Sequence, residues 1–339
     1  MKMVGIAVVT EAGLLIARRA STWTVDERLG GRSPECVAVD LRRPAQVYCG
    51  TARAGLLRSR DSGRNWEPVG PGIDHPMVTA VNVGHAEQAD GFGIVYAGTE
   101  PSAVFRSDTG GDSWVNLASL RGLSSADTWS FPPRPHTHHV RWIEADVSVV
   151  DRVFVAIEAG ALVRSFDGGR TWRDRVRGGP YDTHTAVTHP LAPGRIYSAA
   201  GDGYFESTDA GESWRSPEDG LKHRYLVGVA VDLADPDTVI VSATDDPRIR
   251  LFAAAGRVVR LSEDWAQAMG AGNERPAGGE GHDGAGSLLM LANQVSSTLP
   301  ITTDSSDQMM QDGAGRFWTS LAAPSKGDTA LVAATETAP

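Results

Sequence analysis

The sequence predicts an all-β protein, a single β-propeller of seven blades that extends over residues 1–339. Three observations lead to this fold class. A short motif recurs at intervals of about 48 residues, short β-forming segments alternate with turn residues, and 38 glycines and 9 tryptophans are spread along the chain. Many short strands with a periodic glycine and aromatic motif are typical of propeller blades.

The recurring motif is Ser-x-Asp-x-Gly-x-x-Trp. Its copies begin at Ser59, Ser107, Ser165 and Ser207, and a degenerate copy begins at Thr302. The third position of these five copies is held by Asp61, Thr109, Asp167, Asp209 and Asp304. The copies start 48, 58, 42 and 95 residues apart, so the last interval holds two repeats. Trp265 marks the repeat inside that interval and Trp23 marks one before the first copy, which brings the number of repeats to seven.

The residue types of the motif have a mechanical reason. The Ser hydroxyl and the Asp carboxylate accept hydrogen bonds from backbone N–H groups in a tight turn. The Gly permits a positive φ, and the Trp begins the next strand and packs on its neighbours. We therefore assign Asp61, Asp167, Asp209 and Asp304 a structural role rather than a catalytic one.

Each repeat is predicted to form four short strands. In the fourth repeat we expect them at residues 140–145, 152–157, 161–165 and 171–174. The blades are expected at residues 1–30, 31–72, 73–120, 136–178, 181–218, 223–270 and 282–316. A β-helix would repeat at a shorter period, and a sandwich would not repeat.

The ring is expected to close by pairing of the N- and C-terminal strands, with the closing strands inside residues 317–336. Two segments near the C-terminus are candidates for closing strands. Residues 317–321 are candidates for the innermost strand of the first blade, and residues 330–335 for the strand beside it, a place that residues 3–10 also fit. Residues 266–286, rich in Gly and Ala, are expected to form a long loop.

With these motifs the chain resembles the BNR or Asp-box β-propellers over nearly its whole length. That family includes sialidases, sortilin-type receptors, photosystem assembly factors and proteins described as glycosyl hydrolases, so the resemblance implies a fold rather than one activity. A sialidase would be expected to carry a Phe/Tyr-Arg-Ile-Pro segment near its start and three arginines that grip a carboxylate. The nearest segment, Phe131-Pro-Pro-Arg134-Pro, has a different spacing and lies inside the chain. We therefore do not expect a sialidase.

Composition excludes several classes of partner. The formal net charge is −10 and the basic residues are not clustered, so a nucleic-acid backbone would be repelled. No apolar stretch approaches the ~20 residues of a membrane span, and Glu11 interrupts the apolar run at the N-terminus. We expect a cytoplasmic protein with no membrane partner.

Cys36 and Cys49 flank a predicted turn and are expected to be free, half-buried thiols.

The order of strands in a blade predicts which residues share a face. The chain enters a blade along its innermost strand and runs outward, so the motifs, between third and fourth strands, all lie on one face. The connections into the inner strands and the turns between second and third strands lie on the other face, where propellers bind ligands in a central funnel.

Histidines are concentrated in the connections into the inner strands. Seven of the nine occupy this position: His75, His136, His138, His139, His184, His223 and His282. We predict that His139, His184 and His223, with His75 as a fourth candidate, bind a divalent metal ion, for which Zn, Fe, Mn and Ni are admissible. The alternative is that these are solvated loop histidines, or that they bond to backbone carbonyls at the starts of strands. No nucleotide cofactor is expected.

Carboxylates and aromatic residues accompany the histidines on this face. Glu100 and Glu158 occupy turns that do not require an acidic residue, so we predict that they act as acid–base groups, with Arg141 as a further catalytic residue. The predicted substrate-binding residues are Trp129, Trp142, Tyr181, Tyr225 and Arg53. The alternative for the two tryptophans is that they anchor the core or a loop.

Two functions fit these residues. The first is an enzyme of hydrolase or lyase type that processes a small molecule or saccharide in the funnel, through a metal ion or through carboxylates alone. The second is a non-catalytic propeller that binds a protein or a small ligand, as the assembly factors of this fold do.

Overall fold

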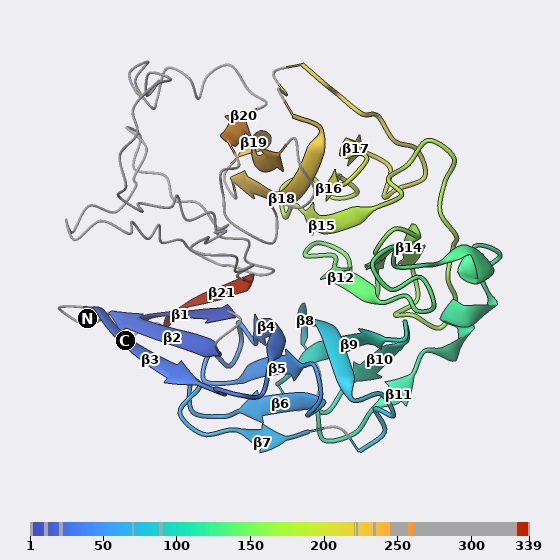
Figure 1. Cartoon of the computed structure of the whole chain (residues 1–339). Coiled ribbons are helices and arrows are strands. Elements are labelled where there is room, and N and C mark those ends of the chain that lie inside the picture. The colour runs from blue at the N-terminus through green and yellow to red at the C-terminus, as the bar shows by residue number, and fades with distance from the viewer. Residues whose placement is uncertain are drawn as a thin grey trace, which may run out of the picture.

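The computed structural model of the chain is an all-β protein built from antiparallel sheets. It describes residues 3–9, 13–19, 23–69, 71–87, 91–219, 221, 223–232, 235–244, 257–260 and 331–337. Within these residues six sheets of three or four strands stand around a common centre, as blades do in a propeller (Figure 1). The blade predicted at residues 282–316, the loop predicted at 266–286 and the motif residue Asp304 lie outside the described residues.

The first three sheets have four strands each. The first contains β21 (Leu331–Thr337), β1 (Met3–Val9), β2 (Leu14–Arg19) and β3 (Trp23–Arg28), in that order. The second contains β4 (Pro34–Val39), β5 (Val47–Thr51), β6 (Leu56–Ser59) and β7 (Glu67–Pro68). The third contains β8 (Met77–Glu87), β9 (Gly93–Glu100), β10 (Val104–Ser107) and β11 (Val115–Asn116), and is followed by the 3-10 helices η1 (Ala118–Gly122) and η2 (Ala126–Thr128).

The other three sheets have three strands each. They contain β12 (Val140–Ala145), β13 (Val153–Ile157) and β14 (Ala161–Ser165); β15 (Thr183–Thr188), β16 (Ile196–Ala200) and β17 (Gly203–Ser207); and β18 (Tyr225–Asp232), β19 (Asp235–Thr244) and β20 (Arg257–Arg260). The strand expected at 171–174 is reduced to one bridge between Arg164 and Arg173. The carboxylate of the next residue, Asp174, accepts hydrogen bonds from Ser124 and Ser125.

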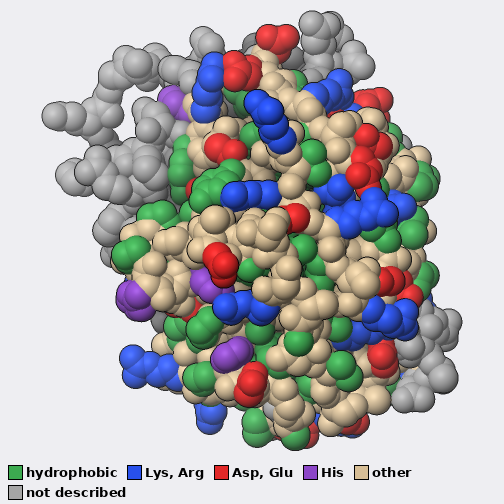
Figure 2. All heavy atoms as spheres, turned by 90° about the vertical axis from the view of Figure 1, so that its right-hand side faces the viewer, with side chains coloured by type: hydrophobic (Ala, Val, Ile, Leu, Met, Phe, Trp, Pro, Cys, Tyr) green, Lys and Arg blue, Asp and Glu red, His purple; other side chains and the backbone are tan. Residues whose placement is uncertain are grey.

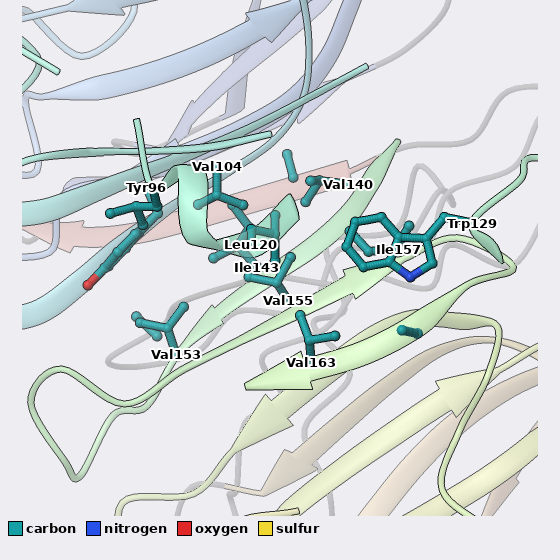
Figure 3. Close-up of a cluster of buried hydrophobic side chains, with 14 of the residues drawn as sticks. Tyr96, Val104, Leu120, Trp129, Val140, Ile143, Val153, Val155, Ile157 and Val163 are labelled. Carbon is teal, nitrogen blue, oxygen red and sulfur yellow. The ribbon is translucent and has the colours of Figure 1, made fainter. Parts of the chain in front are cut away.

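The hydrophobic core lies between neighbouring sheets. One cluster joins residues of the third sheet, such as Tyr96 and Val104, to residues of the fourth, such as Ile143 and Val155 (Figure 3). Equivalent clusters fill the other interfaces between described sheets. The strands alternate between these two packed faces, which explains why the middle strands β5, β13 and β16 are buried along their whole length.

The two ends of the chain meet in the first sheet, where β21 pairs antiparallel with β1 from Met3↔Thr337 to Val9↔Leu331. Residues 331–337 thus take the innermost place, and residues 3–9 form the second strand of that sheet. The prediction that residues 330–335 form the strand beside the innermost one is therefore wrong, because residues 3–9 occupy that place. Residues 317–321 lie outside the described part of the chain. A count of seven blades and a closed ring stay predictions, since six sheets lie within the described residues.

The predicted turn motif, hereafter the Asp box, has the hydrogen bonds that its residue types suggest. In the copy at Ser165, the hydroxyl accepts from Gly169 N at 2.8 Å, and Asp167 Oδ1 accepts from Thr171 N at 2.9 Å. Gly169 has φ of +90°, a conformation that favours glycine. The copies at Ser59 and Ser207 repeat these bonds, and each box tryptophan packs into the interface with the preceding sheet.

Arginines in the third strand of a sheet connect three of the described boxes to the sheet before them. This feature was not predicted. Each donates to a backbone carbonyl in the box of the following sheet, in the pairs Arg18 with Ser62, Arg58 with Gly110 and Arg106 with Gly168. We call these three residues the box arginines. They join neighbouring sheets on the box face by hydrogen bonds in addition to the apolar interfaces.

The surface of the molecule carries charges of both signs. On the face in Figure 2 basic and acidic side chains are interspersed. Among the described residues, no helix is both long and apolar enough to cross a bilayer.

Cys36 and Cys49 are free thiols on the paired strands β4 and β5, and burial raises the pKa of both. They are fully buried, whereas the sequence predicted half-buried thiols.

Candidate functional site

The strand ends on the face opposite the boxes carry a polar cluster. It consists of residues from the turns after second strands and from the starts of inner strands: Glu35, Glu100, Arg134, His139, Arg141, Glu158, Asp182, His184 and Tyr225. The inner strands β4, β8, β12, β15 and β18 contact one another in sequence around the centre. Residues at equivalent positions of these strands are therefore neighbours.

A β-bulge near the start of each of these five inner strands places residues of this cluster. The register of pairing with the second strand shifts by one residue at Glu35 in β4, at Arg141 in β12 and at His184 in β15. The same shift occurs at Thr79 in β8 and Val227 in β18. A bulge leaves one residue outside the ladder and re-aims its side chain, and bulges are common next to active sites. Three of the five bulge residues are charged or titratable.

Glu158 is the centre of the cluster. It follows β13 directly and is buried, with 4% of its surface exposed. Its Oε2 lies 2.9 Å from His139 Nε2 and 3.4 Å from Arg141 Nε. The turn is fixed to the neighbouring connections, because Glu158 N donates to His139 O and Gly160 N donates to Tyr181 O. A buried carboxylate is thus held between two cationic or proton-donating side chains.

Glu100 forms the second part of the cluster, on the side of the third sheet. Its carboxylate accepts from Arg134 Nε at 3.2 Å and is also paired with the other end of that guanidinium. His139 Nδ1 lies 3.8 Å from Glu100 Oε2, so the imidazole stands between Glu100 and Glu158. Phe131 packs edge-on against His139 with ring centroids 4.8 Å apart, and Arg134 lies over the Phe131 ring. The segment before β12 therefore covers this side of the cluster.

Asp182 and His184 form the third part, at the start of β15. Asp182 Oδ1 accepts from Ala159 N at 2.7 Å, and Asp182 Oδ2 lies 3.6 Å from His184 Nε2. His184 Nδ1 donates to Leu226 O at 2.6 Å, and the Tyr225 hydroxyl lies 3.3 Å from His184 Nε2. Glu158, Asp182 and His184 each offer one ligand atom within 4.8 Å of the others.

The electrostatics of the cluster combine burial with opposite charges. Partial desolvation raises the pKa of Glu35 above its ordinary value, although Arg141, His139 and Arg134 act to lower it. Burial acts to raise the pKa of Asp182 too, but the interactions with His184 and the hydrogen bond from Ala159 N together outweigh burial and hold that pKa below its usual range. Carboxylates with perturbed pKa values grouped in this way are common at functional sites.

The structure brings together about half of the predicted site residues. Those in the polar cluster are Glu100, Glu158, Arg141, His139, His184 and Tyr225. The potential ligand group among the described residues includes neither His223 nor His75, and His75 lies 3.7 Å from Asp74. The side chain of Arg53 is exposed in the turn after β5. Tyr181 is 42% exposed, with Arg175 over its ring.

The predicted role of the two tryptophans as a stacking surface is wrong. Trp129 is 5% exposed, and Figure 3 shows its indole among the side chains of the core. Its Nε1 donates to Ser125 Oγ. Trp142 is also 5% exposed, and its Nε1 donates to Ala186 O in the next sheet. Because both rings pack in interfaces between sheets, neither offers a face to a ligand, and the alternative role as core anchors describes them.

Three residues of the cluster were missed or underrated. Glu35 and Arg134 were not assigned to the site, and Asp182 was not counted among the metal ligands. Glu35 precedes Cys36 at the start of β4, the position that Arg141 holds in β12. An alignment of the repeats at their inner strands would have revealed this equivalence. The position of Arg134 depends on how the inserted segment folds back, for which the sequence has no periodic signal.

A cavity of about 250 Å³ lies elsewhere, on the box face between the third and fourth sheets. Its lining includes Arg42, Tyr96, Asp146 and Arg152. It contains none of the residues of the polar cluster, so we do not assign it to the candidate site.

Comparisons with known proteins identify a fold but no family. No protein-family model and no curated protein matches the sequence. An ancestral GH74 enzyme matches the structure with a TM-score of 0.50 and 17% identity, over 64% of this chain and 28% of that one. A COPII outer coat vertex on membranes matches with a TM-score of 0.51 and 12% identity, over 71% and 64%. YCF48 bound to D1 peptide matches with a TM-score of 0.35 and 15% identity, over 66% and 80%.

These similarities support a propeller-like fold and nothing finer. The chain spans between 28% and 42% of the length of the GH74 enzymes that it matches. A fold shared at such low sequence identity does not select between the two classes of function.

Proposed function

We propose that this chain is a seven-bladed Asp-box propeller, closed by its terminal strands, and that it processes a small molecule or saccharide at the polar cluster. The proposed reaction is of hydrolase or lyase type and takes place in the central funnel opposite the boxes. Its active groups are carboxylates, with Glu158 as the main acid–base group and Glu100 as the second.

One observation carries this proposal. Glu158, which is 4% exposed, contacts both His139 and Arg141, at the end of the molecule where the inner strands are bulged. Burying a carboxylate costs free energy unless it is paired and hydrogen-bonded. A hydrophobic residue would close this turn at less cost, so the arrangement favours a chemical role for Glu158.

The neighbours of Glu158 suit proton transfer. His139 Nε2 is within hydrogen-bonding distance of the carboxylate, so a proton can pass between the two groups. Arg141 stabilises the ionised form of Glu158 by charge. The hydroxyl groups of a saccharide can hydrogen-bond to such carboxylates and guanidinium groups, and the exposed ring of Tyr181 offers a surface for a sugar to pack against.

A non-catalytic binding function is the second candidate, favoured by the pairing of Glu100. Arg134 engages both of its carboxylate oxygens, and Arg134 is itself half-exposed. Such a preformed ion pair can recognise a polar ligand or a peptide without any reaction. The two functions differ in whether turnover depends on Glu158.

The test is to assay the full chain with a panel of 4-nitrophenyl glycosides and esters, beside the variant Glu158→Gln. We expect turnover by the wild type and a loss of roughly 10²–10⁴-fold in kcat/KM for the variant. The matched control is Glu27→Gln, an exposed glutamate on the outer strand β3, which should leave turnover unchanged. Equal turnover by Glu158→Gln and wild type would contradict the catalytic role. No turnover, with panel members binding in calorimetry, would favour the second candidate.

A further inference from the structure

We propose that Glu158, Asp182 and His184 together bind a divalent transition-metal ion. This inference deepens the proposed function, because it names a cofactor for the same polar cluster. Of the four histidines expected from the sequence it keeps His184, and it takes the carboxylates of Glu158 and Asp182 as the other ligands.

The first argument is the protonation of His184. Its Nδ1 lies 2.6 Å from Leu226 O, and a carbonyl oxygen only accepts, so Nδ1 carries a proton. In the neutral imidazole the lone pair is then on Nε2, the atom that faces Asp182 Oδ2 at 3.6 Å. A backbone carbonyl on the far nitrogen is the usual arrangement of a metal-binding histidine, since it fixes the tautomer and the orientation of the ring.

The second argument is the excess of electron pairs at one point. His184 Nε2 and one oxygen each from Glu158 and Asp182 lie within 4.8 Å of one another. Such atoms repel one another, and a metal ion between them would relieve that repulsion beyond what His139 and Arg141 beside Glu158 already do. The side chains of His184 and Glu158 are nearly completely buried, so water cannot screen the repulsion fully.

The third argument is that the surrounding backbone restricts the carboxylate of Asp182. Ala159 N donates to Asp182 Oδ1, which leaves Oδ2 on the side of His184. A Cβ atom on Gly201 would stand 2.2 Å from Asp182 Oδ2 and 3.0 Å from the ring of Tyr225. Only a glycine at position 201 therefore leaves room for the aspartate in this orientation. The donor group is held in place by neighbours on two sheets rather than exposed on a mobile loop.

The ligand types limit the choice of ion. One imidazole and two carboxylates are suited to Zn²⁺ or Mn²⁺, whereas an all-oxygen site would favour Mg²⁺ or Ca²⁺. Bond lengths of about 2.0–2.2 Å to Zn²⁺ imply ligand atoms about 3.4 Å apart. Rotation of a carboxylate that moves its oxygen by about 1 Å would therefore complete the site. Completion by a water molecule or a substrate oxygen would leave the open position that catalytic metal sites have.

The experiment is a calorimetric titration of the full chain, freed of metal with a chelator, with ZnCl₂ and with MnCl₂. We expect one ion per chain and a rise in the thermal unfolding midpoint when the ion is present. Asp182→Asn keeps the acceptor for Ala159 N, and His184→Asn keeps a donor toward Leu226 O. We expect each to weaken binding at least tenfold, and circular dichroism checks that each is folded. Gly201→Ala, which leaves all three ligands in the sequence but displaces Asp182, should weaken binding as well.

His189→Gln is the matched control. His189 is equally buried and its Nε2 lies 2.7 Å from Asp232 O, at the other end of β15. This variant should bind the ion like the wild type. No stoichiometric binding by the wild type, or equal binding by His184→Asn and His189→Gln, would overturn the inference. Ion binding that depends on His184 supports it even if no glycoside or ester is turned over. Turnover that persists in chelator, with no ion bound, would retain the proposed function and remove the metal.

Discussion

Glu144 shows how much a single buried residue can contribute to the behaviour of the protein. It lies on the inner strand β12, and its Oε1 accepts hydrogen bonds from the backbone N–H and the hydroxyl of Thr188, both at 2.9 Å. Its second oxygen is buried with no hydrogen-bond partner among the described residues. Burial raises the pKa of Glu144 to about 8. The folded protein therefore holds this proton at neutral pH, whereas the unfolded chain releases it.

The pKa of Glu144 predicts a pH dependence of stability. Its folded-state pKa of about 8 exceeds the ordinary value of 4.5, so the folded state binds more protons between these two pH values. The free energy of unfolding should therefore fall as pH rises from about 5 to about 8, by a few kcal/mol at most. Glu144→Gln removes this titration and should flatten the dependence. Urea unfolding at pH 5, 6.5 and 8 measures it, and identical slopes for the two proteins would contradict the prediction.

The residues of the site were predictable to the extent that they follow the repeat. Glu158, Glu100 and His139 were placed on one face because strand order determines the face of each turn. The role of Trp142 was not predictable, because a shift of one residue in a strand exchanges its faces, and a bulge produces such a shift at Arg141. No local feature of the sequence marks this bulge.

At the scale of the element, the Asp box is a turn whose stability depends on its third residue. Asp167 accepts from Ser165 Oγ, Thr171 N and Thr171 Oγ1. The box at Ser107 has Thr109 in that place. The hydroxyl oxygen of Thr109 accepts a hydrogen bond from Ser113 N and also lies within hydrogen-bonding distance of the Ser113 hydroxyl. The sequence predicted this turn well because the hydrogen bonds of its Ser and Asp side chains are local.

Opposite changes in two boxes test this role. Asp167→Ala should lower the free energy of unfolding by about 1–2 kcal/mol, because backbone donors of the turn lose their acceptor. Thr109→Asp should raise it by a smaller amount, since a carboxylate can accept from both the N–H and the hydroxyl of Ser113. Chemical denaturation measures both. A catalytic loss in Asp167→Ala without a loss of stability would contradict the structural role.

The box arginines act between elements and illustrate what local patterns leave out. Arg58 is 3% exposed, pairs with Glu67 of its own sheet, and donates to Gly110 O of the next one. Gly110 lies in a different repeat, so no local pattern in the sequence predicts this contact. Arg58→Lys keeps the charge but loses the planar fork that reaches two partners at once.

We expect Arg58→Lys to destabilise the protein by about 1–3 kcal/mol. The matched control is Arg60→Lys, because Arg60 pairs with the same Glu67 and with Asp112 but is 56% exposed. Exposed ion pairs contribute little, so this variant should change stability by less than about 0.5 kcal/mol. Urea unfolding of both variants decides the matter, and equal losses would show that burial of Arg58 has no special effect.

At the scale of the whole molecule, the pairing of β21 with β1 joins the ends of the chain. Removal of residues 331–337 and the two residues after them would leave β1 with an unpaired edge along seven residues. We expect the shortened protein to unfold at a lower temperature and to associate through that edge. Removal of residues 338–339 alone is the control and should have no effect. Thermal unfolding and size-exclusion chromatography measure the outcome, and an unchanged monomer would contradict it.

The overall architecture was the most predictable property, because the repeat determines it. The period of the box predicted the order of sheets, and six of them lie within the described residues. The assignment of terminal strands was not decidable from composition, since residues 317–321 and 330–335 are both suited to a strand. Only the register with β1, which is a contact across the whole chain, distinguishes them.

The pairing of β21 with β1 also affects how the protein folds during its synthesis. β1 to β3 leave the ribosome before the other described sheets, yet their innermost partner β21 follows about 300 residues later, on the order of tens of seconds of synthesis. For that time the earliest hairpins expose a strand edge that can pair with another nascent chain. The later sheets can fold as they emerge, because their strands are consecutive in the sequence. When several ribosomes translate one messenger RNA close together, the first sheet is therefore more exposed to pairing with another nascent chain than the other described sheets are.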